Sequence, residues 1–194
     1  MYEESVGVPL ILAGPGVPRS RVCPTNASLV DIFPTVVQAA GAAFTAEDAS
    51  LPGRSLLDLA WSAPANRDVF AEYHDGWSQN ALFMLRDARH KYIHYTHDRP
   101  QLFDMIADPL ETHDLAGDPA AVNDRRRMET KLRAVVDPEA VDASAKADQE
   151  ARIEQSGGRD RLSIRGDDFR YTPAPAEYAP VDQRSLIRPD RPSS

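Results

Sequence analysis

The sequence predicts a mixed α/β fold that changes character along the chain, and three observations support this prediction. An apolar run at residues 8–13 ends in Gly14-Pro15-Gly16, as is typical of a strand buried on both faces of a parallel sheet. Four strand-like segments between residues 69 and 105 follow one another without helices, which favours a small antiparallel sheet. Asp118-Pro119 and Asp137-Pro138 are helix start signals.

The first part of the chain, residues 1–66, continues after this strand with a polar loop and a helix. The helix is expected from Asp31 to Ala40, with Pro34 in its first turn and Gly41 as its stop. Its expected core face consists of Ile32, Val36 and Val37. Residues 42–66 are expected to be mostly irregular, with a turn at Pro52-Gly53 and a short helix at residues 55–61.

The second part, residues 67–136, is predicted to be an antiparallel subdomain with a packed helix. The expected strands cover residues 69–73, 82–86, 90–95 and 101–105, and residues 87–89 join the second and third as a hairpin. A helix should run from Asp118 to about Val136, with Met128, Leu132 and Val135 packed on the sheet.

The last part, residues 137–194, is predicted to be a helix followed by a polar tail. Alanines give this helix only a thin apolar stripe, and Gly157-Gly158 should end it. The remaining residues are rich in Arg, Asp and Pro, a composition that buries little surface and favours an extended or disordered tail.

Composition excludes several classes of function. The chain has 194 residues and a net charge of -8, which argues against general binding to nucleic acids or anionic membranes. Its single cysteine, Cys23, cannot form an intramolecular disulfide. No apolar run reaches the ~20 residues of a membrane span. No signal peptide is visible, so the localisation stays open, with the cytoplasm favoured.

Three stretches of sequence resemble one known enzyme family. The first runs from Tyr2-Glu3-Glu4-Ser5 through Val8-Pro9-Leu10-Ile11, and the second is Leu29-Val30-Asp31-Ile32-Phe33-Pro34-Thr35. The third contains Arg86, Lys91-Tyr92-Ile93, Gln101-Leu102-Phe103-Asp104, Asp108-Pro109, Glu111 and Asp114-Leu115-Ala116. In this order they resemble the C-terminal portion of type I sulfatases, of the arylsulfatase and choline-sulfatase-like kind, in the alkaline phosphatase-like superfamily.

This resemblance implies a fold and an activity. It implies a late strand and helix of the main α/β sheet at residues 1–66, followed by the antiparallel subdomain. Full enzymes of this family hydrolyse sulfate esters with a formylglycine and a calcium ion, which an upstream part not contained in this chain would supply. Gly7 replaces a basic residue common in the family, and Asp114 replaces an Asn.

The sequence predicts no catalytic residue and no metal ligand within this chain. Cys23-Pro24-Thr25-Asn26 does not fit the nucleophile motif Cys/Ser-x-Pro-x-Arg, and a small loop or core thiol is the expected role of Cys23. Asp167-Asp168 is an isolated pair in a polar tail. The chain alone is therefore expected to be inactive and to bind no cofactor.

Two residues are candidates for contact with a substrate. His74 follows a predicted strand and enters a polar loop, where side chains commonly contact ligands; an ordinary surface histidine is the alternative. Trp77 could stack on the organic part of a substrate or anchor the core. The remaining histidines of this region, His90, His94 and His97, are expected on a solvent-facing polar surface.

The sequence thus predicts the C-terminal part of a sulfatase, with a small sulfate ester as the substrate of the full enzyme. Two alternatives stay open at this point: a phosphonate or phosphate monoester hydrolase of the same superfamily, and a non-catalytic module from a truncated or split gene. The apolar strand at residues 8–13 would expose an edge in the isolated chain, so association with the upstream part or between copies is expected.

Overall fold

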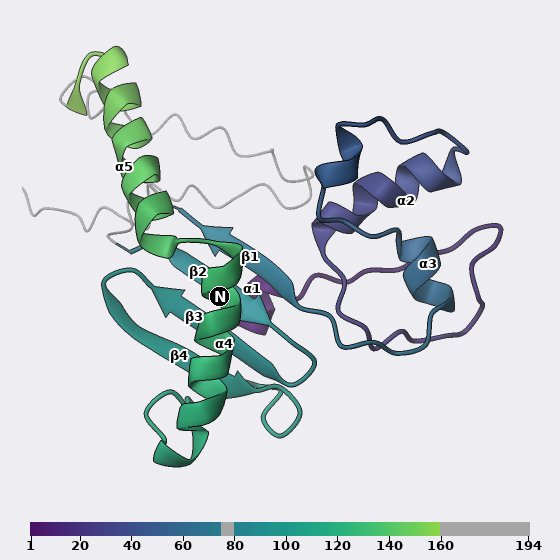
Figure 1. Cartoon of the computed structure of the whole chain (residues 1–194), viewed down its shortest axis with the longest axis horizontal. Coiled ribbons are helices and arrows are strands. Elements are labelled where there is room, and N and C mark those ends of the chain that lie inside the picture. The colour runs from purple at the N-terminus through teal and green to yellow at the C-terminus, as the bar shows by residue number, and fades with distance from the viewer. Residues whose placement is uncertain (75–79, 160–194) are drawn as a thin grey trace, which may run out of the picture. The chain divides into compact units, whose positions relative to one another are not determined.

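The computed structural model describes residues 1–74 and 80–159. The chain divides into two units, residues 1–149 and 150–194. Figure 1 shows the elements. In the first part these are α1 (Glu3–Val6), the 3-10 turns at Leu29–Asp31 and Asp48–Ser50, α2 (Ile32–Ala39) and α3 (Leu56–Trp61). The sheet and its helices are β1 (Val69–Tyr73), β2 (Leu82–Arg86), β3 (His90–Tyr95), β4 (Asp98–Asp104), a 3-10 turn at Pro119–Ala121, α4 (Val122–Val135) and α5 (Pro138–Gln155).

The four strands form one antiparallel sheet in the order β1-β2-β3-β4, which confirms the prediction. β4 begins three residues earlier than expected and includes Pro100. The proline is tolerated because β4 is an edge strand, where a missing N–H need not break a ladder hydrogen bond. The pairing of β3 with β4 is irregular between Ile93 and Tyr95.

α4 covers one face of this sheet (Figure 1). Asp118 caps the 3-10 turn Pro119–Ala121 that leads into α4, by accepting a hydrogen bond from the backbone N–H of Ala120. Met128 and Leu132 are fully buried against Phe83 and Tyr92. Val135, however, is exposed, because it lies in the last turn of α4, at the edge of the buried stripe.

The opposite face of the sheet is covered by the first residues of the chain. Met84, Ile93, Phe103 and Met105 form a second apolar cluster, against which Met1 and Val6 pack. The sheet is therefore buried on both faces, one by a helix and the other by residues 1–6.

The region of α2 and α3 is built from short elements. Gly41 follows α2 with a φ of +64°, as expected for a helix stop. Ser55 caps α3 with its side chain. The predicted core face of α2 is wrong: Ile32 and Val36 are exposed, and Asp31, Pro34 and Thr35 are buried instead. A polar side chain, Asp31, organises the inner side of this helix.

The strand predicted at residues 8–13 is not formed. A strand of a parallel sheet needs neighbouring strands, and none of the described residues pairs with this segment. Val8, Leu10 and Ile11 are consequently exposed, with Ile11 89% accessible.

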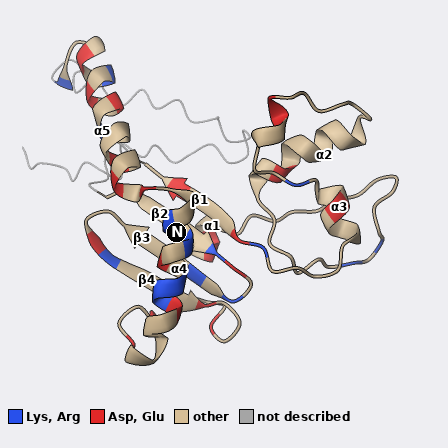
Figure 2. Ribbon diagram, in the orientation of Figure 1, with Lys and Arg blue, Asp and Glu red and all other residues tan. Residues whose placement is uncertain are grey.

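α5 ends at Gln155, close to the predicted stop at Gly157-Gly158. Figure 2 shows basic residues along α4 and acidic residues on α5. None of the helices in the described part of the chain has the length and apolar character needed to cross a membrane. Residues 160–194, which contain the tail and Asp167-Asp168, lie outside the described residues.

Candidate functional site

His74, a predicted substrate contact, lies just after β1. Its side chain is 19% exposed, and its ring packs edge-on against Phe83, with 5.3 Å between the centroids. Its Nε2 is 3.8 Å from a carboxylate oxygen of Glu72. Both ring nitrogens are buried and have no hydrogen-bond partner among the described residues.

The hollow beside His74 is small. Its other walls come from Asn80 and Ala81, just before β2, and from Asp142, Ala145, Lys146 and Gln149 of α5. Its volume of about 10 Å³ has room for one water molecule. Trp77, the second predicted substrate contact, lies in residues 75–79, outside the described part of the chain. Substrate contact by His74 and Trp77 thus stays a prediction.

Residues that could hold a metal are not brought together. Within residues 1–74 and 80–159, no group of three or more His, Cys, Asp and Glu side chains is arranged to bind a cation. Cys23 is a free, exposed thiol in a loop, and its Sγ lies 3.6 Å from the carbonyl oxygen of Leu59. The described residues therefore do not fit a calcium ion or a formylglycine centre.

Several residues that carry the resemblance to sulfatases meet in buried groups of charged side chains. The first of these groups is centred on Lys91. This side chain is 0% exposed and points to the face of the sheet that residues 1–6 cover. Its ammonium lies 2.7 Å from Glu3 and 2.8 Å from Glu111. Arg86 donates a hydrogen bond of 2.7 Å to Glu3. Burial alone would raise the pKa of Glu3, but Lys91 and Arg86 outweigh it and hold that pKa below its usual value.

The second ion pair is centred on Asp31, which is 0% exposed. Its two carboxylate oxygens accept hydrogen bonds of 2.6 and 2.7 Å from the guanidinium of Arg67. They also accept the backbone N–H groups of Ser28 and Arg54, each at 2.8 Å. Burial opposes ionisation, but these four bonds outweigh it, so the pKa of Asp31 is lowered. Asp31 thereby connects the start of α2 to the segment leading into β1.

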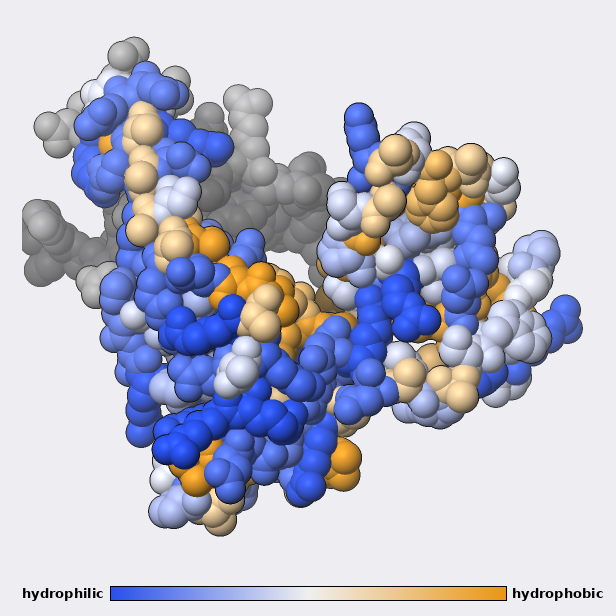
Figure 3. All heavy atoms as spheres, in the orientation of Figure 1, coloured by the Kyte–Doolittle hydropathy of each residue, from blue (hydrophilic) through white to orange (hydrophobic). Residues whose placement is uncertain are grey.

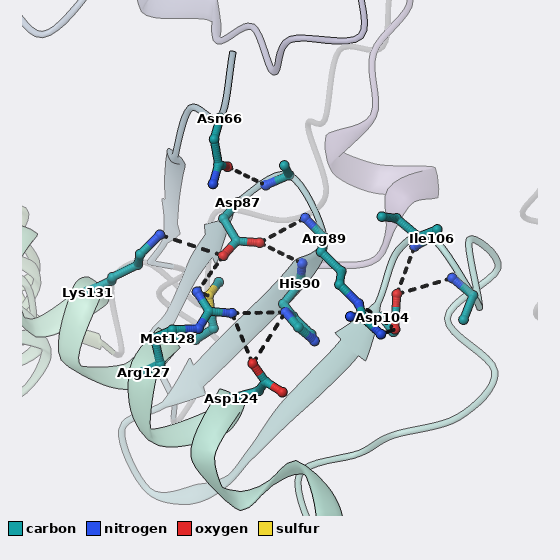
Figure 4. Close-up of polar contacts among 12 residues, drawn as sticks. Asn66, Asp87, Arg89, His90, Asp104, Ile106, Asp124, Arg127, Met128 and Lys131 are labelled. Atoms are coloured by element: carbon teal, nitrogen blue, oxygen red, sulfur yellow. Dashed lines mark hydrogen bonds and ion pairs between the residues drawn. The ribbon is translucent and has the colours of Figure 1, made fainter. Parts of the chain in front are cut away.

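The third group surrounds Asp87 in the hairpin between β2 and β3 (Figure 4). One oxygen of Asp87 accepts the N–H groups of Arg89 and His90, and the other accepts a 2.6 Å bond from Arg127 of α4. Burial opposes ionisation of Asp87, but these hydrogen bonds and the charge of Arg127 outweigh it and lower the pKa of Asp87 to about 2. Arg127 also donates to Nδ1 of His90 at 3.0 Å, which assigns the proton of a neutral His90 to Nε2.

Solvent exposure was predicted for His90, His94 and His97, and the prediction is wrong for the two that lie in β3. His90 and His94 are buried, because α4 and the start of α5 cover the face of β3 that carries them. His94 lies 3.3 Å from Glu139. His97 is exposed as expected and lies 3.4 Å from Asp142. These contacts fix the helices on the sheet and do not form an open site.

Sequence reasoning missed the ion pairs, although one signal for Lys91 was present. Lys91 alternates with Ile93 and Tyr95 along β3, so it shares their face of the strand. A lysine on an apolar face needs a buried partner. Its partners Glu3 and Glu111 are 88 and 20 positions away in the sequence, and only the fold brings them together.

A separate apolar cleft of about 440 Å³ lies in the first part of the chain. Its walls are the unpaired residues Leu10, Ile11 and Leu12, the loop around Cys23, and Leu56 and Leu59 of α3. Figure 3 shows further hydrophobic surface over α2, where Ile32, Phe33 and Val36 are exposed.

Comparison with known proteins identifies the family. Residues 1–137 match the model of the C-terminal region of N-sulphoglucosamine sulphohydrolase. The chain is 36% identical over 156 residues to mouse (Mus musculus) arylsulfatase K, covering 74% of this chain and 27% of that protein. It is 34% identical over 155 residues to choline-sulfatase of Rhizobium meliloti (strain 1021), covering 78% of this chain and 30% of that protein.

Structural comparison agrees with the sequence matches. A solved structure of the 2-O GAG sulfatase BT1596 superimposes with a TM-score of 0.54 at 25% identity. The match covers 72% of this chain and 30% of BT1596. The chain thus spans less than a third of the length of each of these relatives. It belongs to the sulfatase family, and residues 1–137 correspond to the C-terminal region of these proteins.

Proposed function

We propose that this chain acts as the C-terminal part of a sulfatase and completes an enzyme that hydrolyses sulfate esters. The observation that carries the proposal is the family match over residues 1–137, combined with coverage of only 27–30% of the relatives. The nucleophile and the metal would come from the remaining part of the enzyme.

The exposed apolar surface of the first part supports this role. The backbone N–H groups of residues 10–13 make no hydrogen bond with described residues, and their side chains line the apolar cleft. Unpaired backbone next to apolar side chains is suited to strand addition to another sheet. We assign residues 8–13, with the cleft beside them, as the docking segment for the rest of the sulfatase.

The cofactors of the family are expected in the part of the enzyme outside this chain. The described residues hold no cluster suited to calcium, and Cys23 lies in a sequence that departs from the nucleophile motif. Calcium and formylglycine are therefore assigned to the part of the enzyme outside this chain, where they would supply Lewis-acid and nucleophilic chemistry.

His74 and Trp77 are proposed to contact the sulfate ester from the loop after β1. A neutral imidazole can donate one hydrogen bond to a sulfate oxygen, and the buried ring nitrogens of His74 lack partners among the described residues. The hollow of about 10 Å³ beside them would have to widen to admit the sulfate. Trp77 would stack on the organic part of the substrate. A phosphonate or phosphate monoester hydrolase has less support, because the curated relatives described above are sulfatases.

A fusion enzyme tests the proposal. The full chain replaces the matching segment of the choline-sulfatase of Rhizobium meliloti, and turnover of p-nitrophenyl sulfate and choline sulfate is measured. We expect the fusion to be active. The choline-sulfatase that lacks its own matching segment and carries no replacement should be inactive. A folded fusion with a cooperative melt but no turnover would contradict the proposal.

A further inference from the structure

Residues 1–6 form a strap, by which we mean the segment that crosses the face of the sheet opposite α4. The ring of Tyr2 packs on Phe103 with 5.7 Å between the centroids, and its hydroxyl lies 3.0 Å from Gln101. Met1 and Val6 pack against the apolar cluster of the same face. The strap thus joins the first residues of the chain to Arg86 of β2 and Lys91 of β3, through contacts that span 83 and 90 positions in the sequence.

Buried charges hold this strap at its centre. Lys91 bridges Glu3 of the strap and Glu111 of the loop after β4, and it donates a hydrogen bond to the carbonyl oxygen of Met1 at 3.2 Å. Glu111 also accepts the backbone N–H of Glu3 at 2.6 Å. With Arg86, the group contains two positive and two negative side chains.

The backbone of Glu111 indicates that this arrangement is specifically held. Its φ of +54° lies in the left-handed region, which costs free energy for a residue with a side chain. The conformation directs one carboxylate to both Lys91 and the strap. Such strain persists only where surrounding contacts determine it.

The strap leads directly into the docking segment. Gly7 donates to the carbonyl oxygen of Glu3 at 2.7 Å, and a Cβ at this position would lie 2.8 Å from the same oxygen. The chain therefore turns closely at Gly7 before residues 8–13 leave the sheet. The ion pair between Glu3 and Lys91 consequently fixes the point at which the docking segment begins.

We propose that Lys91 is a positioning residue that, through Glu3 and Glu111, latches the strap and so fixes the docking segment for assembly with the rest of the sulfatase. This inference rests on the proposed function for the identity of the partner. The latch itself is a property of this chain. Removing Lys91 leaves the buried Glu111 and the half-buried Glu3 without the cation that they share, so that only Arg86 still pairs with Glu3 and the two carboxylates repel each other. The strap is expected to detach while α4 keeps its own core on the other face.

The first measurement is hydrogen–deuterium exchange of the full chain, comparing Lys91→Met with the wild type. We expect residues 3–7 to exchange at least tenfold faster in the variant, and the amides of α4 to keep their protection. Glu3→Gln leaves Lys91 paired with Glu111 and should give a smaller increase at the same residues, which covers the case in which Lys91→Met fails to fold. Arg133→Met, which removes an exposed ion pair of 2.8 Å with Glu139, is the matched control and should leave the strap unchanged.

The second measurement titrates each chain into the choline-sulfatase that lacks the matching segment. A positioning role predicts that Lys91→Met raises the half-saturating concentration at least tenfold and leaves the maximal activity unchanged, whereas Arg133→Met alters neither. An unchanged strap exchange in both Lys91→Met and Glu3→Gln would overturn the latch. A detached strap with an unchanged half-saturating concentration would overturn its role in assembly. Absence of activity with the wild-type chain would overturn the proposed function and the assembly role, and the exchange data would still decide the latch.

Discussion

Replacement of Asp31 by Asn tests how strongly one buried carboxylate stabilises the first part of the chain. The substitution keeps the size of the side chain and removes its charge. Each carboxylate oxygen accepts one bond from Arg67 and one backbone N–H. In Asn an amide NH₂ group, which cannot accept a hydrogen bond, would replace one of these oxygens. It would face one N–H group of Arg67 and one backbone N–H, both of which are donors. The guanidinium of Arg67, whose side chain is 13% exposed, would lose its counter-charge.

The expected cost follows from this geometry. Removing one partner of a buried, hydrogen-bonded ion pair costs about 3–5 kcal/mol, because the other charge stays buried without compensation. With a urea m-value of roughly 2 kcal/mol/M, the unfolding midpoint should fall by about 1.5 M or more. Far-UV circular dichroism in urea measures this shift. Asp58→Asn, on the exposed side of α3, is the control and should change stability by about 0.5 kcal/mol or less.

A midpoint shift for Asp31→Asn below about 0.5 M, comparable to the control, would refute the reasoning. It would mean that water or a rearranged loop compensates Arg67. A double-mutant cycle with Arg67→Met separates the pair interaction from the backbone bonds. We expect the two substitutions together to cost less than the sum of the single costs, because each single variant already breaks the same ion pair.

Four further predictions concern the activity, association and pH response of the chain. The isolated chain should hydrolyse no chromogenic aryl sulfate and bind no calcium tightly, and turnover that a chelator abolishes would contradict this. It should self-associate through the docking segment in sedimentation experiments, with Ile11→Lys reducing association; a monomeric wild-type chain would contradict this. In the active fusion, His74→Ala should lower kcat/KM tenfold or more, about 1.4 kcal/mol, while a large fall in Tm would make His74 structural. Asp87, with its pKa of about 2 in the folded chain against about 3.9 when unfolded, should contribute stability above pH 4 that is lost as the pH falls towards 2; Asp87→Asn should weaken this dependence in acid titrations.

The sequence predicted the elements whose signals are local. The four strands follow from their alternation and short connections, and α4 follows from Asp118-Pro119 and the spacing of Met128 and Leu132. These features depend on residues that are close in the chain. The antiparallel sheet and its packed helix could therefore be predicted without any knowledge of the tertiary contacts.

Features that depend on distant partners were not predicted. The apolar segment at residues 8–13 has the composition of a buried strand, but a strand forms only beside another, and the described residues provide none. The inner side of α2 is set by the bond between Asp31 and Arg67, and not by hydrophobic periodicity. His90 and His94 were assigned to solvent because the sequence does not show which face of β3 the helices cover.

The same reasoning applies to the candidate site. The sequence predicted a role for His74 because it enters a polar loop after a strand. The structure places His74 beside a small hollow that is also lined by residues of α5. The sequence also singled out Glu3, Lys91 and Glu111 as family-like residues without giving them a role. Their convergence in one buried group accounts for them as structural residues.

The central claim is that this chain completes a sulfatase, and a titration in trans tests it most directly. The choline-sulfatase of Rhizobium meliloti without the segment matched by this chain is held at a fixed concentration, and hydrolysis of p-nitrophenyl sulfate is followed as the full wild-type chain is added. The account predicts activity that rises and saturates near equimolar chain, with no activity from either component alone. A flat response over the whole titration, with both components folded, would contradict it.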